Sequence, residues 1–97
     1  MAFWVYMLQC ADKSYYVGHT DDLERRVAEH ESGTIAGYTQ SRRPVWLVFS
    51  DSFPTRLEAL EAERRLKGWG RAKKEALVAG DWQRVSELGR KRFSRQD

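Results

Sequence analysis

Residues 3–30 read FWVYMLQCADKSYYVGHTDDLERRVAEH, and they contain the clearest strand and helix signals of the chain. Residues 3–10 are dense in aromatic and branched side chains, which is typical of a strand that is apolar on both faces. Residues 11–14 favour a short polar turn and residues 15–19 a second strand, so the pair predicts a β-hairpin. Gly18, at the end of the second strand, indicates that another group approaches the backbone closely or that the backbone conformation is special.

A helix is expected directly after the hairpin. Thr20 or Asp21 can cap it, because each offers an oxygen to the free N–H groups of a first helical turn. Glu24 follows Asp21 by three residues, as in a capping box. At about 100° per residue, Leu23 and Val27 define the apolar direction of this helix.

Two adjacent arginines on this helix point in different directions. Arg26 and His30 fall on one flank of the apolar stripe, one turn apart. Arg25 points nearly opposite, towards solvent, where Glu29 can pair with it. We therefore expect Arg26 to be the arginine held at the surface of the sheet. An alternative is that Arg26 only pairs with Asp22, four residues earlier.

The middle of the chain gives a loop, a strand and a helix. Residues 31–43 are rich in Gly, Ser and Thr without a helical period, which predicts a loop. Residues 44–50 predict a third strand that is apolar on both faces. A capping box formed by Thr55 and Glu58 predicts a second helix over residues 56–67.

Glu63 is the most unusual residue of this second helix. Ala59, Ala62 and Leu66 lie together on its apolar side, and Leu60 borders them. Glu63 falls between the directions of Leu60 and Leu66. An acid is rarely placed inside an apolar arc unless it is paired or binds a ligand. A salt bridge to another helix is the structural alternative.

The last third of the chain is basic and helical. Residues 71–79 predict a third helix closed by Gly80. Asp81 can cap a last short helix over residues 82–89. The stripe expected to be buried on this last helix consists of Trp82, Val85 and Leu88.

Length and composition limit what the chain can be. With 97 residues it is expected to form one domain, with a core over about residues 3–70 and a basic helical extension over residues 71–97. The single cysteine, Cys10, excludes an internal disulfide and a multi-cysteine zinc site, and suits a reduced cytoplasmic location. The longest apolar run, residues 3–8, is too short to span a bilayer, so no membrane partner is expected.

Charge is distributed unevenly along the chain. Residues 1–63 contain 6 Lys and Arg against 10 Asp and Glu, a net charge of −4. Residues 64–97 contain 11 against 4, a net charge of +7, and the whole chain carries +3. A basic segment beside an acidic body suggests a polyanionic partner such as nucleic acid. The alternative is an ordinary solubilising surface.

The chain resembles the GIY-YIG endonuclease superfamily in two three-residue motifs that each contain a tyrosine, in one arginine and in one glutamate. The first triplet of that family corresponds to Trp4-Val5-Tyr6, which keeps only the tyrosine, and the second to Tyr16-Val17-Gly18. The family's arginine corresponds to Arg26 and its metal-binding glutamate to Glu63. The resemblance covers about residues 3–70 and looks most like the small stand-alone members. Several branches have an asparagine late in the domain, and this chain contains none.

The resemblance implies both a fold and a chemistry. The fold is α+β, with a three-stranded antiparallel sheet flanked by helices in the order β-β-α-β-α-α. The chemistry is hydrolysis of phosphodiester bonds in DNA with one divalent cation, Mg²⁺ or Mn²⁺. Glu63 is implied as the metal ligand, because a hard oxygen donor suits Mg²⁺. Arg26 is implied to bind the scissile phosphate and to stabilise charge in the transition state.

Either tyrosine can be the residue that activates the attacking water. A tyrosine that acts as a base near pH 7 needs its pKa lowered by about 3 units. Tyr6, Tyr16 and His30 are therefore grouped with Arg26 and Glu63 as the expected catalytic residues. The structural alternative for His30 is a packing residue with satisfied hydrogen bonds. The residues expected to bind substrate are Gly18, His19, Arg42, Arg43, Lys67, Arg71, Lys73 and Lys74.

Three functions remain open on the sequence alone. The first is a metal-dependent DNA endonuclease, the second a nucleic-acid-binding module with a vestigial active site, and the third a protein-interaction domain. The presence of both tyrosines with Arg26 and Glu63 favours the nuclease, because a pure binding module needs no inward-facing acid. The basic C-terminal stretch suits the first two equally. DNA is the expected partner, and a protein partner is left open.

Overall fold

A computed structural model describes the backbone of residues 1–94 and the side chains of residues 1–89. The chain divides into two compact units, the first from Met1 to Lys67 and the second beginning at Gly68. Each unit is described by itself. The expected organisation as a single domain with a basic extension stays a prediction.

The first unit is built on a three-stranded antiparallel sheet. Its strands are β1 (Phe3–Cys10), β2 (Tyr15–Thr20) and β3 (Val45–Phe53), in the order β2-β1-β3. The predicted hairpin is therefore confirmed. In its register Tyr6 lies opposite Gly18, and Val5 lies opposite His19. Because side chains alternate along a strand, Tyr6 and His19 point to opposite faces of the sheet.

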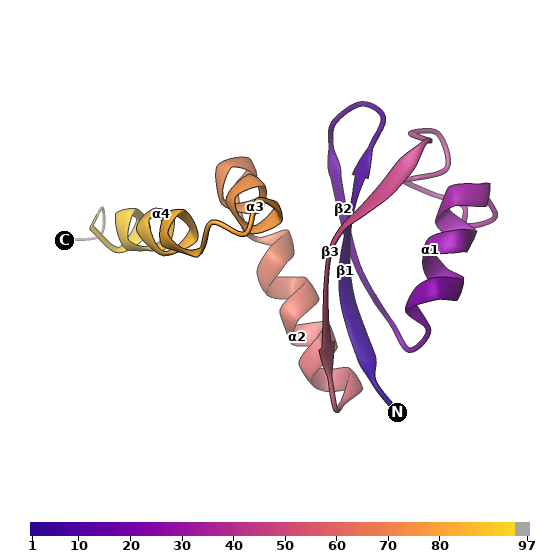
Figure 1. Cartoon of the computed structure of the whole chain (residues 1–97), viewed down its shortest axis with the longest axis horizontal. Coiled ribbons are helices and arrows are strands. Elements are labelled where there is room, and N and C mark those ends of the chain that lie inside the picture. The colour runs from indigo at the N-terminus through magenta and orange to yellow at the C-terminus, as the bar shows by residue number, and fades with distance from the viewer. Residues whose placement is uncertain (95–97) are drawn as a thin grey trace. The chain divides into compact units, whose positions relative to one another are not determined.

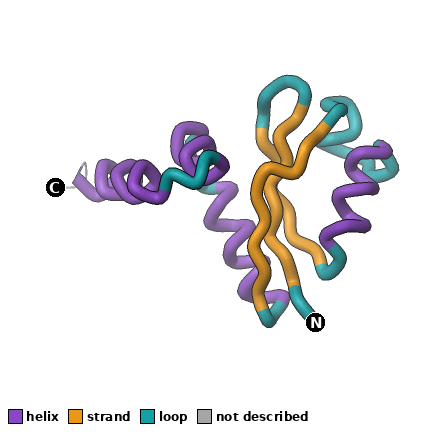
Figure 2. The backbone as a smooth tube through the Cα atoms, viewed as in Figure 1, coloured by secondary structure: helices purple, strands orange, loops and turns teal. Residues whose placement is uncertain are grey.

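One helix covers each face of this sheet (Figures 1 and 2). Helix α1 (Leu23–Ser32) packs Leu23 and Val27 on the face that carries Tyr6. Helix α2 (Arg56–Lys67) packs on β1 and β2 from the other face. Together these layers confirm the α+β class. The buried side chains on the α1 face are Tyr6, Leu8, Cys10 and Val45, and α2 buries Ala59, Ala62 and Leu66.

The helix caps differ in one detail from the sequence prediction. Neither Thr20 nor Asp21 caps α1: the cap is Asp22, whose carboxylate accepts from the backbone N–H of Arg25 at 3.2 Å. The Thr20 hydroxyl instead accepts from the Asp22 N–H at 3.0 Å, so the chain turns one residue later than expected. The predicted bounds of α2 are confirmed, and Thr55 accepts from the N–H of Glu58 at 3.2 Å, as in a capping box.

Strand β3 differs more from the prediction. It extends to Phe53, and most of its side chains are exposed, including Trp46 and Leu47 at 52% and 42%. The predicted strand is confirmed, but its apolar side chains are not all buried. The reason is its place in the sheet, because β3 is an outer strand that pairs only with β1. Its pairing also shifts register between Met7 and Leu8, which interrupts the alternation of buried side chains.

The second unit contains two helices, α3 (Arg71–Val78) and α4 (Trp82–Ser94). Gly80 has a positive φ of 73° between them, and Asp81 accepts from the N–H of Arg84 at 3.0 Å, so the predicted stop and start are confirmed. Helix α4 is longer than expected. Trp82 is 64% exposed and does not join a buried stripe, since it stands at the first turn of its helix. No helix within residues 1–94 is long and apolar enough to cross a membrane.

Candidate active site

Tyr6 lies at the centre of the sheet with its ring packed over Gly18. Its side chain is 2% exposed. A Cβ atom at Gly18 would lie 2.6 Å from the Tyr6 Oη and 2.7 Å from its Cζ, closer than non-bonded atoms allow. The absence of a side chain at this position is therefore what admits the phenol ring. The predicted close approach at Gly18 is confirmed.

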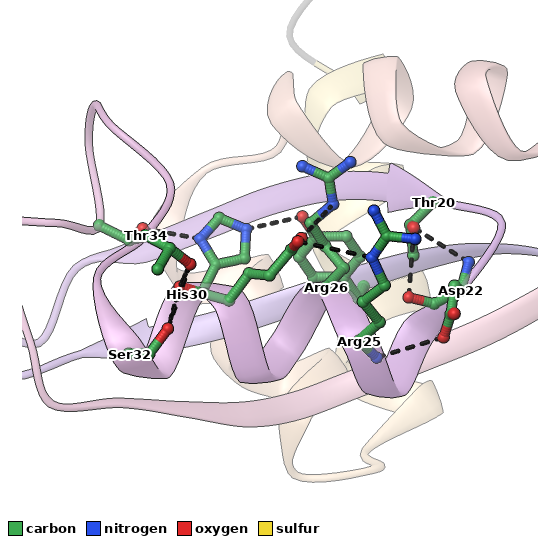
Figure 3. Close-up of polar contacts among 10 residues, drawn as sticks. Thr20, Asp22, Arg25, Arg26, His30, Ser32 and Thr34 are labelled. Carbon is green, nitrogen blue, oxygen red and sulfur yellow. Dashed lines mark hydrogen bonds and ion pairs between the residues drawn. The ribbon is translucent and has the colours of Figure 1, made fainter.

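His30 connects the Tyr6 hydroxyl to the loop that follows α1. Its Nε2 lies 2.9 Å from Tyr6 Oη, and its Nδ1 lies 2.7 Å from Thr39 Oγ1. Figure 3 shows the imidazole with one hydrogen bond on each ring nitrogen. His30 and Thr39 are each only 2% exposed. Every polar atom in this chain of three side chains is thus bonded within the protein.

Tyr16 lies beside this pair and is more accessible. It is half-buried, and its ring centroid lies 6.3 Å from that of Tyr6 and 5.0 Å from that of His30. Tyr38, from the loop, stacks on Tyr16 with centroids 6.1 Å apart. The Arg42 guanidinium lies over the Tyr38 ring, with its Cζ 3.8 Å from the ring centroid. An aromatic row therefore runs outward from Tyr6, and Arg42 ends it.

Arg26 lies on the same helix face as His30, at the side nearer the helix start (Figure 3). Its Nε lies 3.7 Å from one carboxylate oxygen of Glu29, and Arg25 approaches the other at 3.5 Å. The predicted pair of Arg25 and Glu29 is confirmed, and the ion pair of Arg26 is with Glu29. The Arg26 side chain is 43% exposed, so a phosphate can reach its guanidinium.

Glu63 lies on the other face of the sheet. Its Oε1 is 2.8 Å from Nδ1 of His19, and its Oε2 is 3.2 Å from Nζ of Lys67. Only 13% of its side chain is exposed, which confirms the inward direction expected from the helical phase. Burial alone would raise the pKa of Glu63, but the hydrogen bonds from His19 and Lys67 outweigh it and hold the pKa below its usual value. Glu63 is therefore ionised at neutral pH.

The pKa of Tyr6 depends on its burial and on charged residues from both faces of the sheet. Burial, followed by the neighbouring Tyr16, raises the pKa of Tyr6 far above its usual value. Arg26 lowers this pKa and Glu63 raises it, so charges from both faces act on the phenol. Burial and the charge of Arg26 lower the pKa of His30, which keeps the imidazole neutral at neutral pH.

The basic residues expected at the substrate have other contacts in the structure. Arg42 donates to Asp12 at 3.1 Å and to the Tyr38 carbonyl at 2.8 Å, and so ties the loop to the hairpin turn. Arg43 donates to the Gln40 carbonyl at 3.1 Å, within the same loop. The expected role of these two arginines in substrate binding stays a prediction.

Three expected substrate residues lie in the second unit. Arg71 pairs with Glu75 at 3.6 Å, and the Lys73 ammonium lies 4.1 Å from the Trp69 ring centroid. Lys74 is half-buried. Their role stays a prediction.

Sequence reasoning missed Thr39 and Tyr38 as members of the site. Both belong to the loop between α1 and β3, which has no periodicity that would show which residues turn inward. A buried threonine in such a loop leaves no local signal, because its partner His30 lies nine positions earlier and is reached only when the loop folds back.

The donor set for a metal ion is small. Within residues 1–89 no group of three or more His, Cys, Asp or Glu side chains could hold a metal ion. One ionised carboxylate is nevertheless enough for Mg²⁺ when water and substrate phosphate complete the shell. Glu63 is such a carboxylate, and the Lys67 ammonium beside it is on an exposed, flexible side chain. These residues fit a single hard cation and do not fit a cage made of protein ligands.

The hairpin carries one tyrosine on each strand, the next helix carries Arg26 and His30, and the ionised Glu63 lies on the other face of the sheet. The family model described as the GIY-YIG catalytic domain matches residues 2–76. The chain belongs to the GIY-YIG family, and the resemblance expected from its triplets is confirmed.

Its relatives are small proteins of similar length. A UPF0213 protein from Natronomonas pharaonis is 47% identical over 78 residues, which cover 80% of this chain and 92% of the relative. A UPF0213 protein from Halalkalibacterium halodurans is 41% identical over 91 residues, covering 91% and 97%.

Two solved structures are also similar. The solution NMR structure of a UPF0213 protein from Bacillus halodurans is 41% identical, with a TM-score of 0.54 over 91% of this chain and 97% of that one. The solution NMR structure of a protein from E. faecalis is 39% identical, with a TM-score of 0.56 over 82% and 85%.

Proposed function

We propose that this protein is a metal-dependent endonuclease that hydrolyses phosphodiester bonds in DNA. The observation that carries the proposal is Glu63, an ionised and largely buried carboxylate whose charge acts on the Tyr6 phenol. An inward-facing acid that His19 and Lys67 hold in its charged form, within a GIY-YIG catalytic domain, supports a chemical role.

Glu63 is the residue that would hold the cation. A bound Mg²⁺ or Mn²⁺ ion would neutralise the charge that develops on the leaving oxygen. His19 orients the carboxylate through its Nδ1 contact at 2.8 Å. Lys67 approaches the second oxygen at 3.2 Å and has to withdraw from it when a cation binds. The Lys67 side chain is 55% exposed, so its ammonium can move into water when a cation takes its place.

Arg26 is the residue proposed to bind the scissile phosphate. Its guanidinium is charged at every working pH and presents a planar fork that suits two phosphate oxygens. In the absence of substrate Glu29 occupies one side of that fork at 3.7 Å. A phosphodiester would replace this long contact, and the guanidinium would then stabilise the additional charge of the transition state.

Tyr16 is the tyrosine proposed to contact the attacking water. Tyr6 is 2% exposed, and burial raises its pKa, so a free phenolate at Tyr6 is strongly disfavoured. Tyr16 is half-buried and lies between this pair and the loop. We therefore assign water activation to Tyr16 and a supporting role to Tyr6. The sequence alone does not distinguish Tyr6 from Tyr16 as the residue that activates the water.

DNA is the proposed substrate because the chain combines this site with a basic segment. Residues 64–97 carry a net charge of +7, which suits phosphate contacts and counterion release. Arg71, Lys73 and Lys74 are candidates for these contacts. Binding through them is expected to weaken steeply as salt concentration rises.

The test is a cleavage assay with single-stranded, duplex and branched DNA in the presence of Mg²⁺ or Mn²⁺. Glu63→Gln and Tyr16→Phe should each slow cleavage by about 100-fold or more, since each removes a group that acts in the transition state. Glu61→Gln is the matched control, because Glu61 is an exposed acid on the same helix and should leave the rate unchanged.

Two outcomes would contradict the proposal. Cleavage that survives both substitutions would place the chemistry elsewhere. Salt-sensitive DNA binding without any products would favour the nucleic-acid-binding module with a vestigial site.

A further inference from the structure

The Thr39 hydroxyl is a buried donor with one available partner. Thr39 is 2% exposed, and among the described side chains the hydrogen bond of its Oγ1 is the 2.7 Å contact to His30 Nδ1. A hydroxyl hydrogen left without an acceptor inside a protein costs about 1–3 kcal/mol. The hydroxyl hydrogen of Thr39 therefore points to Nδ1, which must carry a lone pair to accept it.

The protonation of the His30 ring follows from this contact. In a neutral imidazole one nitrogen carries the hydrogen and the other accepts. If Nδ1 accepts from Thr39, then Nε2 carries the hydrogen and donates it to the Tyr6 oxygen at 2.9 Å. The hydroxyl hydrogen of Tyr6 is then left to point elsewhere, and the Tyr16 ring lies beside it, with the two ring centroids 6.3 Å apart.

We propose that Thr39 is a positioning residue that holds His30 in the tautomer with its hydrogen on Nε2. His30 is then a hydrogen-bond donor to Tyr6, and Tyr6 is a donor to Tyr16. Three donors in succession, from Thr39, His30 and Tyr6, then point towards Tyr16, which is more accessible than Tyr6.

The direction of these hydrogen bonds would affect catalysis, an inference that rests on the proposed function. A chain of hydrogen bonds with all donors pointing one way polarises each member and stabilises negative charge at its end. The end is Tyr16, whose phenolate form, once its own proton has gone to solvent, would take a proton from the attacking water. The chain thus favours the phenolate that a tyrosine base requires.

The surroundings of His30 are compatible with a neutral ring. Tyr6 approaches from β1, Tyr16 from β2 and Thr39 from the loop, and each of these side chains presents a hydroxyl group and no acid or cation. On its own helix Arg26 disfavours and Glu29 favours the protonated ring, and burial with Arg26 prevails. A protonated ring would have no lone pair to offer Thr39, and the hydroxyl would lose its acceptor.

The tautomer can be measured without any activity. In ¹⁵N-labelled wild-type protein at neutral pH, long-range ¹H–¹⁵N correlations of the His30 ring should show a protonated Nε2 and an unprotonated Nδ1. A ring protonated at Nδ1, at both nitrogens, or in a mixture would overturn the proposal. This result decides the tautomer even if no DNA substrate is ever cleaved, in which case only the proposed function fails.

A pair of substitutions separates positioning from packing. Thr39→Val keeps the shape but removes the donor, and should slow cleavage about tenfold. It should also remove the preference for one tautomer, so that the ¹H–¹⁵N correlations of the His30 ring show a mixture. Thr39→Ser keeps the donor and should restore both properties. An unchanged rate in Thr39→Val, with correct folding shown by its NMR spectrum, would overturn the catalytic part of the proposal.

Discussion

The two faces of the sheet hold their polar residues in opposite ways. On the α1 face the Tyr6, His30 and Thr39 side chains are buried, neutral and fully hydrogen-bonded. On the α2 face Glu63 is charged, and its partners His19 and Lys67 are partly exposed. The contacts on the α1 face are enclosed by packing, whereas those on the α2 face are accessible to solvent and ions.

This difference suggests a division of labour. A neutral, rigid chain suits the handling of a proton, since its members keep fixed orientations. A charged and accessible group suits binding of a cation, which must enter and leave with water and substrate. Gly18 and His19 are adjacent on β2 and serve the two faces separately, Gly18 by admitting the Tyr6 ring and His19 by holding Glu63.

The largest effect on stability is expected from filling the space over Gly18. In Gly18→Ala the new Cβ would lie 2.6 Å from Tyr6 Oη, and the buried ring cannot move aside without breaking its bond to His30. The free energy of unfolding, measured in urea, should fall by about 2 kcal/mol. Gly70→Ala is the control, because no atom lies within 4 Å of its new Cβ, and its effect should be about 0.5 kcal/mol or less. Equal effects would show that Tyr6 is not fixed as described.

A smaller loss of stability is expected when pH is lowered, and the residues on the two faces of the sheet should contribute to it at different pH values. The pKa of His30 is lowered from 6.5, so its contribution to stability is complete above pH 6.5 and is lost as pH falls towards the folded-state value. The pKa of Glu63 is lowered from 4.5, so its contribution is lost only at pH values below 4.5.

Urea unfolding across this pH range checks the order of the two losses. In His30→Gln the free energy of unfolding should change less with pH just below pH 6.5. In Glu63→Gln it should change less with pH below pH 4.5. If His30→Gln changed the pH dependence of stability only below pH 4.5, or Glu63→Gln changed it just below pH 6.5, the two pH ranges would be assigned to the wrong residues.

The parts of this structure that the sequence predicts are those with local causes. The hairpin follows from strand-forming residues on either side of a polar turn, and the bounds of α2 follow from its capping box. The inward direction of Glu63 follows from helical phase alone, because a helix places every side chain at a fixed angle.

The parts that could not be predicted depend on contacts distant in sequence. The exposure of Trp46 depends on strand order, which no single strand encodes. Thr39 meets His30 only because the loop folds back, and the cap of α1 is chosen among three adjacent residues that can all act as caps. The partition of Tyr6 and Glu63 onto opposite faces depends on register, which fixes Tyr6 opposite Gly18 and leaves His19 to face α2.

The central claim is that both faces act on one reaction, and a double-mutant cycle tests it most directly. Single-turnover cleavage of DNA with Mg²⁺ would be measured for wild type, Tyr16→Phe, Glu63→Gln and the double variant. Residues that act as a unit show effects that do not multiply. We predict that the double variant is about as slow as the slower single variant. A rate reduced by the product of the two separate factors would contradict the account.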